Sequence, residues 1–185
     1  VTLMGKTWIA LFSQTGSEIV NISQRLEKRP DLIITNDRPN HLRAIDPAIT
    51  SQDFILHETL NRPKEETLTN IFRQYSKDTE LIVTLHGWLR IIPPKLCDEY
   101  DIYNGHPGLI TKYPELKGKD PQVRMMNGKY NTMGCVLHEV TAGVDEGKII
   151  SSKEVSRKGL EEQDIFRILA NISQDLWVKF LKDKL

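Results

Sequence analysis

The first half of the chain alternates uninterrupted apolar runs with segments in which apolar residues recur every three or four positions. The run Trp8–Phe12 contains no polar residue, which is typical of a strand that is buried on both faces. Helical spacing of apolar residues follows from Ile19 to Leu26, and Pro30 marks the end of this predicted helix.

The same two patterns continue to the end of the chain. A helical stripe of apolar residues predicts a second helix over 68–75 and a last helix over 165–180. The alternation of strands and helices predicts an α/β fold with a mostly parallel sheet and right-handed crossovers. Further strands are predicted at 32–35, 54–56, 81–85, 102–104, 133–140 and 148–155.

Length and composition narrow the class of protein. The 185 residues suit a single domain over 1–185, and the apolar share of 39% argues against disorder. Basic and acidic residues balance at 25 each, whereas a dedicated nucleic-acid binder usually has a basic surplus. No apolar run reaches the about 18–20 residues needed to cross a bilayer. We therefore expect a cytoplasmic protein with neither nucleic acid nor membrane as a partner.

The cysteines and the N-terminus add further expectations. Cys97 and Cys135 are far apart and in no paired motif, which favours a reducing compartment over a disulfide scaffold. Cysteine and histidine nowhere show the spacing of zinc ligands, so no metal is expected. Residues 1–3 are interpreted as an addition ahead of a native Met4, and no signal peptide is recognised there.

Candidate chemistry lies mainly between residues 87 and 147, where most glycines and prolines are found. Loops are therefore concentrated there, and ligands of open α/β sheets bind at loops that follow strands. Asn104 and His106 lie at the end of a predicted strand. An amide and an imidazole together can stabilise negative charge on a carbonyl oxygen, and an imidazole transfers protons near neutral pH. A plain exit from the strand is the alternative.

Two other segments carry polar groups in positions suited to binding. The turn over 13–17 opens the first predicted helix, where free backbone N–H groups favour an anion; a simple turn with Ser17 as N-cap is the alternative. The glycine-flanked loop over 140–147 contains Asp145, which could orient an imidazole, accept a proton, or be an ordinary loop acid.

In order and spacing these segments resemble the folate-dependent formyltransferases, most of all those that act on glycinamide ribonucleotide. The resemblance extends over nearly the whole chain and is sharpest from Leu81 to Ile150. Its motifs are Asn-x-His-Pro at 104–107, Leu-x-x-x-Tyr at 109–113, and His138 followed by Asp-x-Gly at 145–147. It implies the family's fold, a Rossmann-like three-layer sandwich with a mostly parallel central sheet.

The resemblance also implies roles for individual residues. Asn104 and His106 would contact the formyl oxygen and stabilise the oxyanion of the tetrahedral intermediate. Asp145 would hold His106 or a water molecule and assist proton transfer from the attacking amine. The folate would be bound by Leu89, Arg90, Ile91, Ile92, Thr141, Ala142, Gly143 and Val144. The amine substrate would be bound by Thr15, Gly16, Ser17, His86, Gly87 and Pro107.

The implied activity is transfer of the formyl group of 10-formyltetrahydrofolate to the primary amine of a small, phosphorylated substrate. Glycinamide ribonucleotide, a purine precursor, is the first choice of acceptor, because the family's tRNA-modifying and hydrolytic members carry extra domains and its sugar-nucleotide enzymes extend further. A homodimer is compatible with this reading.

Two departures from the family pattern concern the acceptor. The turn over 13–18 has a single glycine and includes Glu18, and Glu115–Asp120 replaces a run expected to read like Gly-Leu-His. Three alternatives therefore stay open. They are transfer to an amino sugar nucleotide or another small amine, folate binding without transfer, and an unrelated nucleotide binder, which the single-glycine turn disfavours.

Overall fold

The computed structural model describes residues 5–36, 44–143 and 145–185. Strand β1 (Lys6–Phe12) lies in the middle of the strands formed by the first half of the chain. Residues Trp8 to Phe12 are each 0% exposed. Their continuous apolar pattern predicts this burial, because a parallel strand covered on both faces has no side that can carry polar residues. Two predictions, the addition at 1–3 and a folate contact at Val144, lie outside the described residues.

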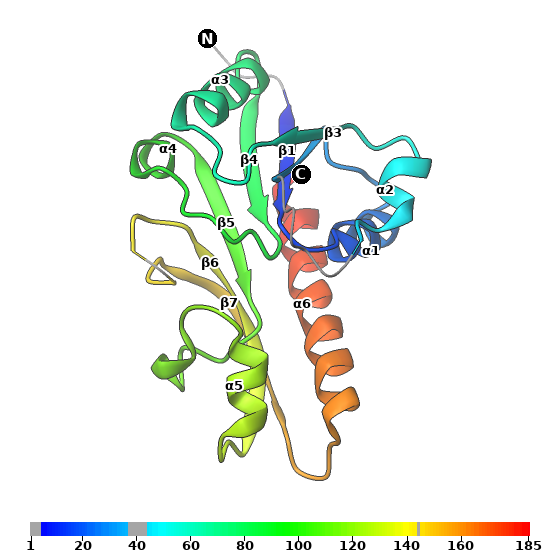
Figure 1. Ribbon diagram of the computed structural model, residues 1–185, viewed down its shortest axis with the longest axis vertical. Helices are drawn as coiled ribbons and strands as arrows, with labels where there is room; N and C mark the ends of the chain where they lie inside the picture. Colours follow the sequence, from blue (N-terminus) through cyan, green and yellow to red (C-terminus); the bar gives the residue numbers. More distant parts are fainter. Residues whose placement is uncertain (1–4, 37–43, 144) are drawn as a thin grey trace. The chain divides into compact units, whose positions relative to one another are not determined.

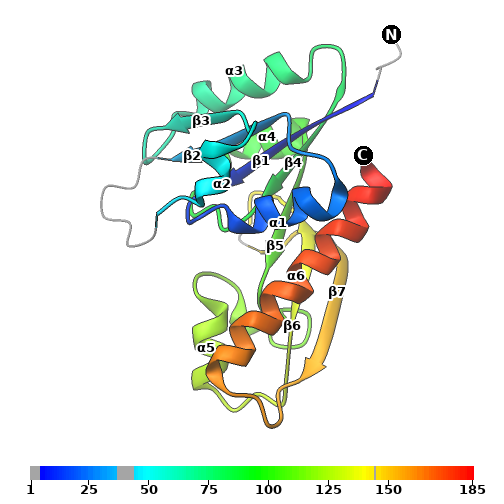
Figure 2. The same cartoon turned by 90° about the vertical axis from the view of Figure 1, so that its right-hand side faces the viewer.

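The chain divides into two units, residues 1–103 with Leu185 and residues 104–184. The prediction that the whole chain is a single domain stays a prediction. In the first unit β1 pairs in parallel with β2 (Leu32–Asn36) and with β4 (Glu80–Leu85). Strand β2 also pairs in parallel with β3 (Leu56–Thr59), which is labelled in Figure 1, and both strands are labelled in Figure 2.

Helices cover the sheet of the first unit on both faces. Figure 2 shows α1 (Ser17–Leu26) and α3 (Glu65–Tyr75) on opposite sides of the strands. Each of the two helices turns its apolar stripe inward: Ile19 and Ile22 of α1 and Leu68 and Phe72 of α3 are all buried. The predicted alternation of strands with helical crossovers is therefore confirmed for this unit.

The second unit is built on an antiparallel pair of strands. Strand β6 (Thr132–Glu139) pairs with β7 (Ile149–Ser156), and helix α6 (Glu162–Lys184) packs against both (Figure 2). The apolar stripe of α6 that the sequence predicts is buried, including Ile165, Leu169, Ile172 and Leu176. Strand β5 (Asp101–His106) crosses the boundary, and its last three residues belong to this unit.

The seven strands follow the hydrogen-bonded order β3-β2-β1-β4-β5-β6-β7. The described pairs are parallel except β6 with β7, which confirms the predicted α/β fold with a mostly parallel sheet. No helix in the described ranges is both long enough and apolar enough to span a membrane.

Four short helical elements were not predicted. They are α2 (Pro47–Ser51), α4 (Pro94–Glu99), the 3-10 turn η1 (Pro114–Leu116) and α5 (Pro121–Asn127). Each begins with a proline, which reads as a loop signal in the sequence but is also favoured at the first position of a helix, where no N–H partner is needed. A further difference concerns β3, which begins at Leu56, where the predicted strand ends.

Candidate active site

Strand β5 delivers two of the predicted catalytic residues to the second unit. Asn104 and His106 are two positions apart, so their side chains leave the strand on the same face. The residue between them is Gly105, and a Cβ placed there would lie 2.7 Å from Nε1 of Trp177. The glycine therefore lets the Trp177 indole pack directly on the strand that carries the site.

The carboxylate of Asp145 lies between two imidazole rings. Its Oδ2 atom is 3.4 Å from Nδ1 of His106, and its Oδ1 atom is 3.2 Å from Nε2 of His138. The three side chains are 9% exposed or less. The N–H of Gly118 also donates to Oδ2 of Asp145, at 2.8 Å. The structure thus brings Asp145 together with His106, as the sequence predicts, and adds His138.

Asp145 has a left-handed backbone conformation, with φ at 52°. This conformation is uncommon outside glycine, although aspartate tolerates it better than most residues, and it occurs preferentially at functional sites. Burial raises the pKa of the Asp145 carboxyl, but its contacts with His138, with His106 and with the Gly118 N–H together lower it below the usual value. The group is therefore a carboxylate at neutral pH.

His106 has both ring nitrogens in defined surroundings. Its Nε2 atom is 2.7 Å from the carbonyl oxygen of Leu116, and because a carbonyl can only accept, Nε2 carries the hydrogen. In the neutral ring, Nδ1 is then an unprotonated base that faces Asp145. Burial lowers the pKa of His106, and this outweighs Asp145 and the Leu116 carbonyl, which raise it. The ring is therefore neutral near pH 7.

A segment after β5 supplies the backbone groups that contact this pair. It runs from Glu115 to Lys119, and the guanidinium of Arg124 in α5 donates to four of its carbonyl groups. The Leu116 carbonyl is one of them, at 3.1 Å from Nη2 of Arg124. The stretch in which the sequence departs from the family pattern is therefore the stretch that touches His106 and Asp145.

Sequence reasoning missed the roles of Leu116, Gly118 and Arg124. The first two act through the main chain, which every residue possesses, so their side chains carry no signal. The position of Arg124 near the last turn of a short helix would have been a weak signal only if α5 had been recognised.

The predicted phosphate turn in the first unit is flanked by carboxylates. Gly16 is the N-cap of α1, with φ at 77° and no side-chain cap, so the alternative of Ser17 as N-cap is wrong. The Ser17 hydroxyl donates to Oδ2 of Asp46 at 2.8 Å, and Glu18 in the first turn lies 2.7 Å from Nδ1 of His86. Negative charge at a helix N-terminus takes the place where an anion would otherwise be favoured. Binding by Thr15, Gly16 and Ser17 stays a prediction.

The predicted folate segment after β4 exposes two apolar side chains. Leu89 is 49% exposed and Ile91 is 76% exposed, whereas Ile92 is buried. The Leu89 N–H donates to the Ser13 hydroxyl at 3.0 Å, which fixes the start of this loop. Arg90 donates to both the carbonyl and the side chain of Asn61. Exposed apolar side chains on a fixed loop suit the binding of a flat ring.

The remaining predicted contacts lie on loops. Thr141 and Ala142 are exposed and Gly143 is half-buried, in the loop between β6 and β7. Pro107 is half-buried and follows His106 directly. These surroundings are compatible with the predicted roles, which stay predictions.

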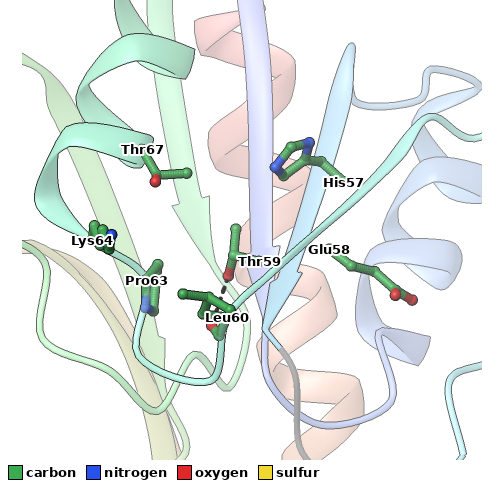
Figure 3. A pocket seen from close by; sticks show the side chains of 7 residues that line it. All are labelled: His57, Glu58, Thr59, Leu60, Pro63, Lys64 and Thr67. Atoms are coloured by element: carbon green, nitrogen blue, oxygen red, sulfur yellow. Dashed lines mark hydrogen bonds between the residues drawn. The ribbon is translucent and has the colours of Figure 1, made fainter.

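A hollow of about 430 Å³ lies in the first unit, between the end of β3 and the start of α3 (Figure 3). None of the residues predicted for the site lines it. Its walls are formed by His57, Glu58, Thr59, Leu60, Pro63, Lys64 and Thr67.

Comparison with known sequences finds relatives that are named as formyltransferases. Phosphoribosylglycinamide formyltransferase of Dictyostelium discoideum is 31% identical over 118 residues, which cover 56% of this chain and 55% of that protein. Methionyl-tRNA formyltransferase of Campylobacter lari is 26% identical over 157 residues, which cover 81% of this chain and 50% of that protein. The chain thus spans about half the length of these curated relatives.

Comparison with solved structures agrees in fold. Phosphoribosylglycinamide formyltransferase from Streptococcus pneumoniae has a TM-score of 0.79 at 18% identity, covering 96% of this chain and 98% of that one. The enzyme from Campylobacter jejuni has a TM-score of 0.73 at 20% identity, covering 97% of each chain. The model of the formyl transferase family matches residues 8–166. On this match, the chain belongs to the formyl transferase family.

Proposed function

We propose that this protein transfers a formyl group from 10-formyltetrahydrofolate to the primary amine of glycinamide ribonucleotide. The observation that carries the proposal is the buried Asp145 carboxylate held beside His106, with Asn104 on the same strand face. Such a cluster, in a chain of the formyl transferase family, has the donor and acceptor groups that the reaction needs. The relatives named for phosphoribosylglycinamide support this acceptor.

The transition state of formyl transfer needs a donor for the formyl oxygen. When the amine attacks the formyl carbon, the carbonyl oxygen becomes negatively charged, and a fixed N–H group stabilises that charge. The Asn104 amide is the neutral donor of this cluster, and it is half-buried on β5. Removing one such donor typically reduces turnover by about 10²–10³-fold.

The same transition state needs a proton acceptor. The amine nitrogen becomes positive as its bond to the formyl carbon forms, and the unprotonated Nδ1 of His106 can take its proton. The Asp145 carboxylate, 3.4 Å away, stabilises the imidazolium that results. The new N–H of the His106 imidazolium can donate to the oxyanion. The proton then passes to the folate nitrogen as the bond from that nitrogen to the formyl carbon breaks. The products are the formylated amine and tetrahydrofolate.

No metal enters this scheme, and the folate is a co-substrate. We assign its contacts to Leu89, Arg90, Ile91 and Ile92 and to residues 141–144. The exposed apolar side chains of Leu89 and Ile91 support the first assignment.

The acceptor has a second candidate, a small amine other than glycinamide ribonucleotide, such as an amino sugar nucleotide. The observation that favours it is the pair of carboxylates, Glu18 and Asp46, at the N-terminus of α1. They weaken the attraction of this turn for a phosphate monoester. The folate donor and the chemistry at His106 would be the same for either acceptor.

The test is an absorbance assay for loss of the formyl donor with and without an amine. Loss that depends on glycinamide ribonucleotide supports the proposal. Loss that depends on an amino sugar nucleotide instead replaces the acceptor and keeps the reaction. Binding of a stable formyl-folate analogue without turnover of any amine would leave a folate-binding protein.

A further inference from the structure

We propose that Arg157 is a positioning residue for the pair formed by His106 and Asp145. Its guanidinium holds the C-terminal end of helix α5, and through Arg124 on that helix it fixes the segment over 115–119, which contacts both side chains. The inference rests on the proposed function, because the pair is catalytic only in that reaction.

The guanidinium of Arg157 meets three carbonyl groups at the end of α5. Its Nη1 atom donates to the carbonyls of Met125 and Gly128 at 2.7 and 2.9 Å, and its Nη2 atom donates to the carbonyl of Met126 at 2.6 Å. The last carbonyls of a helix lack partners within the helix, and a cation at that end also interacts favourably with the helix dipole. Arg157 therefore supplies partners that the end of α5 would otherwise lack.

The backbone of Arg157 is fixed on both sides. The residue follows β7 directly, and its N–H donates to the carbonyl of Asn131, just before β6, at 3.0 Å. Its own carbonyl accepts from the N–H of Leu160 at 3.2 Å, and its side chain is half-buried. Helix α5 needs such an anchor, because its seven residues form too few hydrogen bonds to be stable alone.

The restraint on α5 reaches the site through Arg124. This residue directly precedes the carbonyls that Arg157 holds, and its guanidinium donates to four carbonyls of the segment over 115–119. Both arginines therefore belong to one chain of contacts, in which β7 holds α5 and α5 holds the segment. The two residues act in series, so the effect of Arg157 on the site passes through Arg124.

The segment over 115–119 has one contact with each member of the pair. The Leu116 carbonyl accepts from Nε2 of His106 at 2.7 Å, and the Gly118 N–H donates to Oδ2 of Asp145 at 2.8 Å. These contacts hold the imidazole and the carboxylate 3.4 Å apart. A small displacement of a catalytic group can lower turnover strongly, even when the change that causes it is remote from the reacting atoms.

Loss of the restraint should also change the pKa of His106. Burial is the largest influence on this pKa and lowers it, and the charged or titratable groups that face the ring are Asp145, His138 and Arg124. A looser segment would admit water and let the Arg124 charge move away, and both changes raise the pKa of His106 towards 6.5. A weaker contact with the Leu116 carbonyl has the opposite effect, but burial is the larger influence.

The first test is a double-mutant cycle. In Arg157→Ala we expect kcat to fall about tenfold, as in Arg124→Ala, while the KM for the formyl donor changes less than about twofold. Because the two residues act in series, the double variant should also lose about tenfold, whereas independent effects would multiply to about a hundredfold. Arg157→Lys keeps the charge but not the planar fork, so it should recover only part of the lost kcat.

The control is Lys158→Ala, which removes a positive charge from the exposed neighbouring residue and should keep wild-type kcat. Thermal unfolding would verify that each variant is folded, and Arg157→Lys takes the place of Arg157→Ala in the cycle if the alanine variant does not fold. Wild-type kcat in the folded Arg157 variant, or losses that multiply in the double variant, would overturn the proposal.

The second test needs no substrate. Nuclear magnetic resonance of Arg157→Ala would measure the pKa of His106 and the hydrogen exchange of the Gly118 N–H relative to the amides of β6. We expect a higher pKa than in the wild type and an exchange rate about tenfold higher or more. A wild-type value of either would overturn the proposal, because a cap that only stabilised α5 would leave the pair unchanged. Both changes in a protein that formylates no amine would support the positioning and refute the proposed reaction, so the two failures are distinguishable.

Discussion

Nδ1 of His106 lies 3.4 Å from Oδ2 of Asp145, and both side chains are almost completely buried. The opposite nitrogen of the ring donates to the Leu116 carbonyl, so the neutral ring presents an unprotonated base to a buried carboxylate. A proton that arrives on this base creates an ion pair in a site with little water, where the attraction is stronger than in solvent. The pair can therefore accept a proton from a neutral amine.

Replacement of His106 by alanine should reduce kcat for formyl transfer by about 10²–10³-fold. The variant loses the base that accepts the proton of the amine, and it loses the N–H that would then donate to the oxyanion. Steady-state kinetics with saturating donor would measure the effect, and thermal unfolding would verify that the variant is folded. The control is His57→Ala, an exposed histidine on β3, which should keep wild-type kcat. Near-normal turnover in folded His106→Ala would remove this residue from the mechanism.

Replacement of Asp145 by asparagine should lower kcat and shift the acidic limb of the rate profile. The His106 base must be unprotonated, and burial holds its pKa below the ordinary value of 6.5, so activity should decline only as pH falls below that value. The Asp145 carboxylate raises the pKa of His106, so its removal should move the decline to lower pH. The measurement is kcat/KM against pH for both proteins. A decline that moved to higher pH would contradict this assignment.

Replacement of Arg124 by alanine should have the opposite effect on that limb. The Arg124 charge lowers the pKa of His106, so its loss should move the decline to higher pH. The variant also frees the carbonyls of Glu115, Leu116 and Lys117, and we expect kcat to fall about tenfold because His106 loses a fixed partner.

A matched control for this variant exists on α6. Arg167→Ala removes an exposed arginine that pairs with Asp164 on the same helix. Its pH profile should overlay that of the wild type. The same shift in both variants would mean that overall charge, and not the position of Arg124, sets the pKa of His106.

The stability of the protein should fall in mild acid, in part through His106. Its pKa is lowered by burial in the folded protein, so the unfolded chain takes up a proton first as pH falls below the ordinary value of 6.5. This destabilisation levels off once pH is below the lower pKa of the folded state. Urea unfolding at several pH values would measure the free energy of unfolding, and His106→Ala should show a smaller loss over this range than His57→Ala. Equal losses of unfolding free energy in the two variants would show that His106 does not contribute to the destabilisation in acid.

Removal of the Glu18 charge should improve the binding of a phosphorylated acceptor. Glu18 lies in the first turn of α1, where a carboxylate opposes a second anion. In Glu18→Gln we expect the KM for glycinamide ribonucleotide to fall several-fold at low salt and less at high salt. The KM for an acceptor without phosphate should not change. An unchanged or higher KM for the phosphorylated acceptor would show that its phosphate is bound elsewhere.

The sequence predicts the elements whose pattern is continuous. Strand β1 is recognised because five apolar residues follow one another, and α6 because its apolar stripe persists over several turns. The short helices α4 and α5 escape recognition because the prolines that begin them are also typical of loops. A helix of one or two turns has too few residues to show a period.

In the candidate site, the side chains could be predicted from the sequence, whereas the main-chain groups could not. Asn104, His106 and Asp145 could be named in advance because their amide, imidazole and carboxylate groups carry recognisable chemistry and because their order and spacing resemble those of the formyltransferases. The carbonyl of Leu116 and the N–H of Gly118 could not, because main-chain groups are independent of residue type. Their contact with the site depends on how the segment over 115–119 folds back around Arg124.

The most direct test of the proposed reaction follows the formyl carbon itself. The wild-type protein is incubated with glycinamide ribonucleotide and a donor whose formyl carbon is ¹³C, and the label is observed by nuclear magnetic resonance. We predict that the label leaves the folate and appears as a formamide on the amine over many turnovers, and that His106→Ala forms this product far more slowly. Label that stays on the folate, or that is released only as formate, would contradict formyl transfer to this amine.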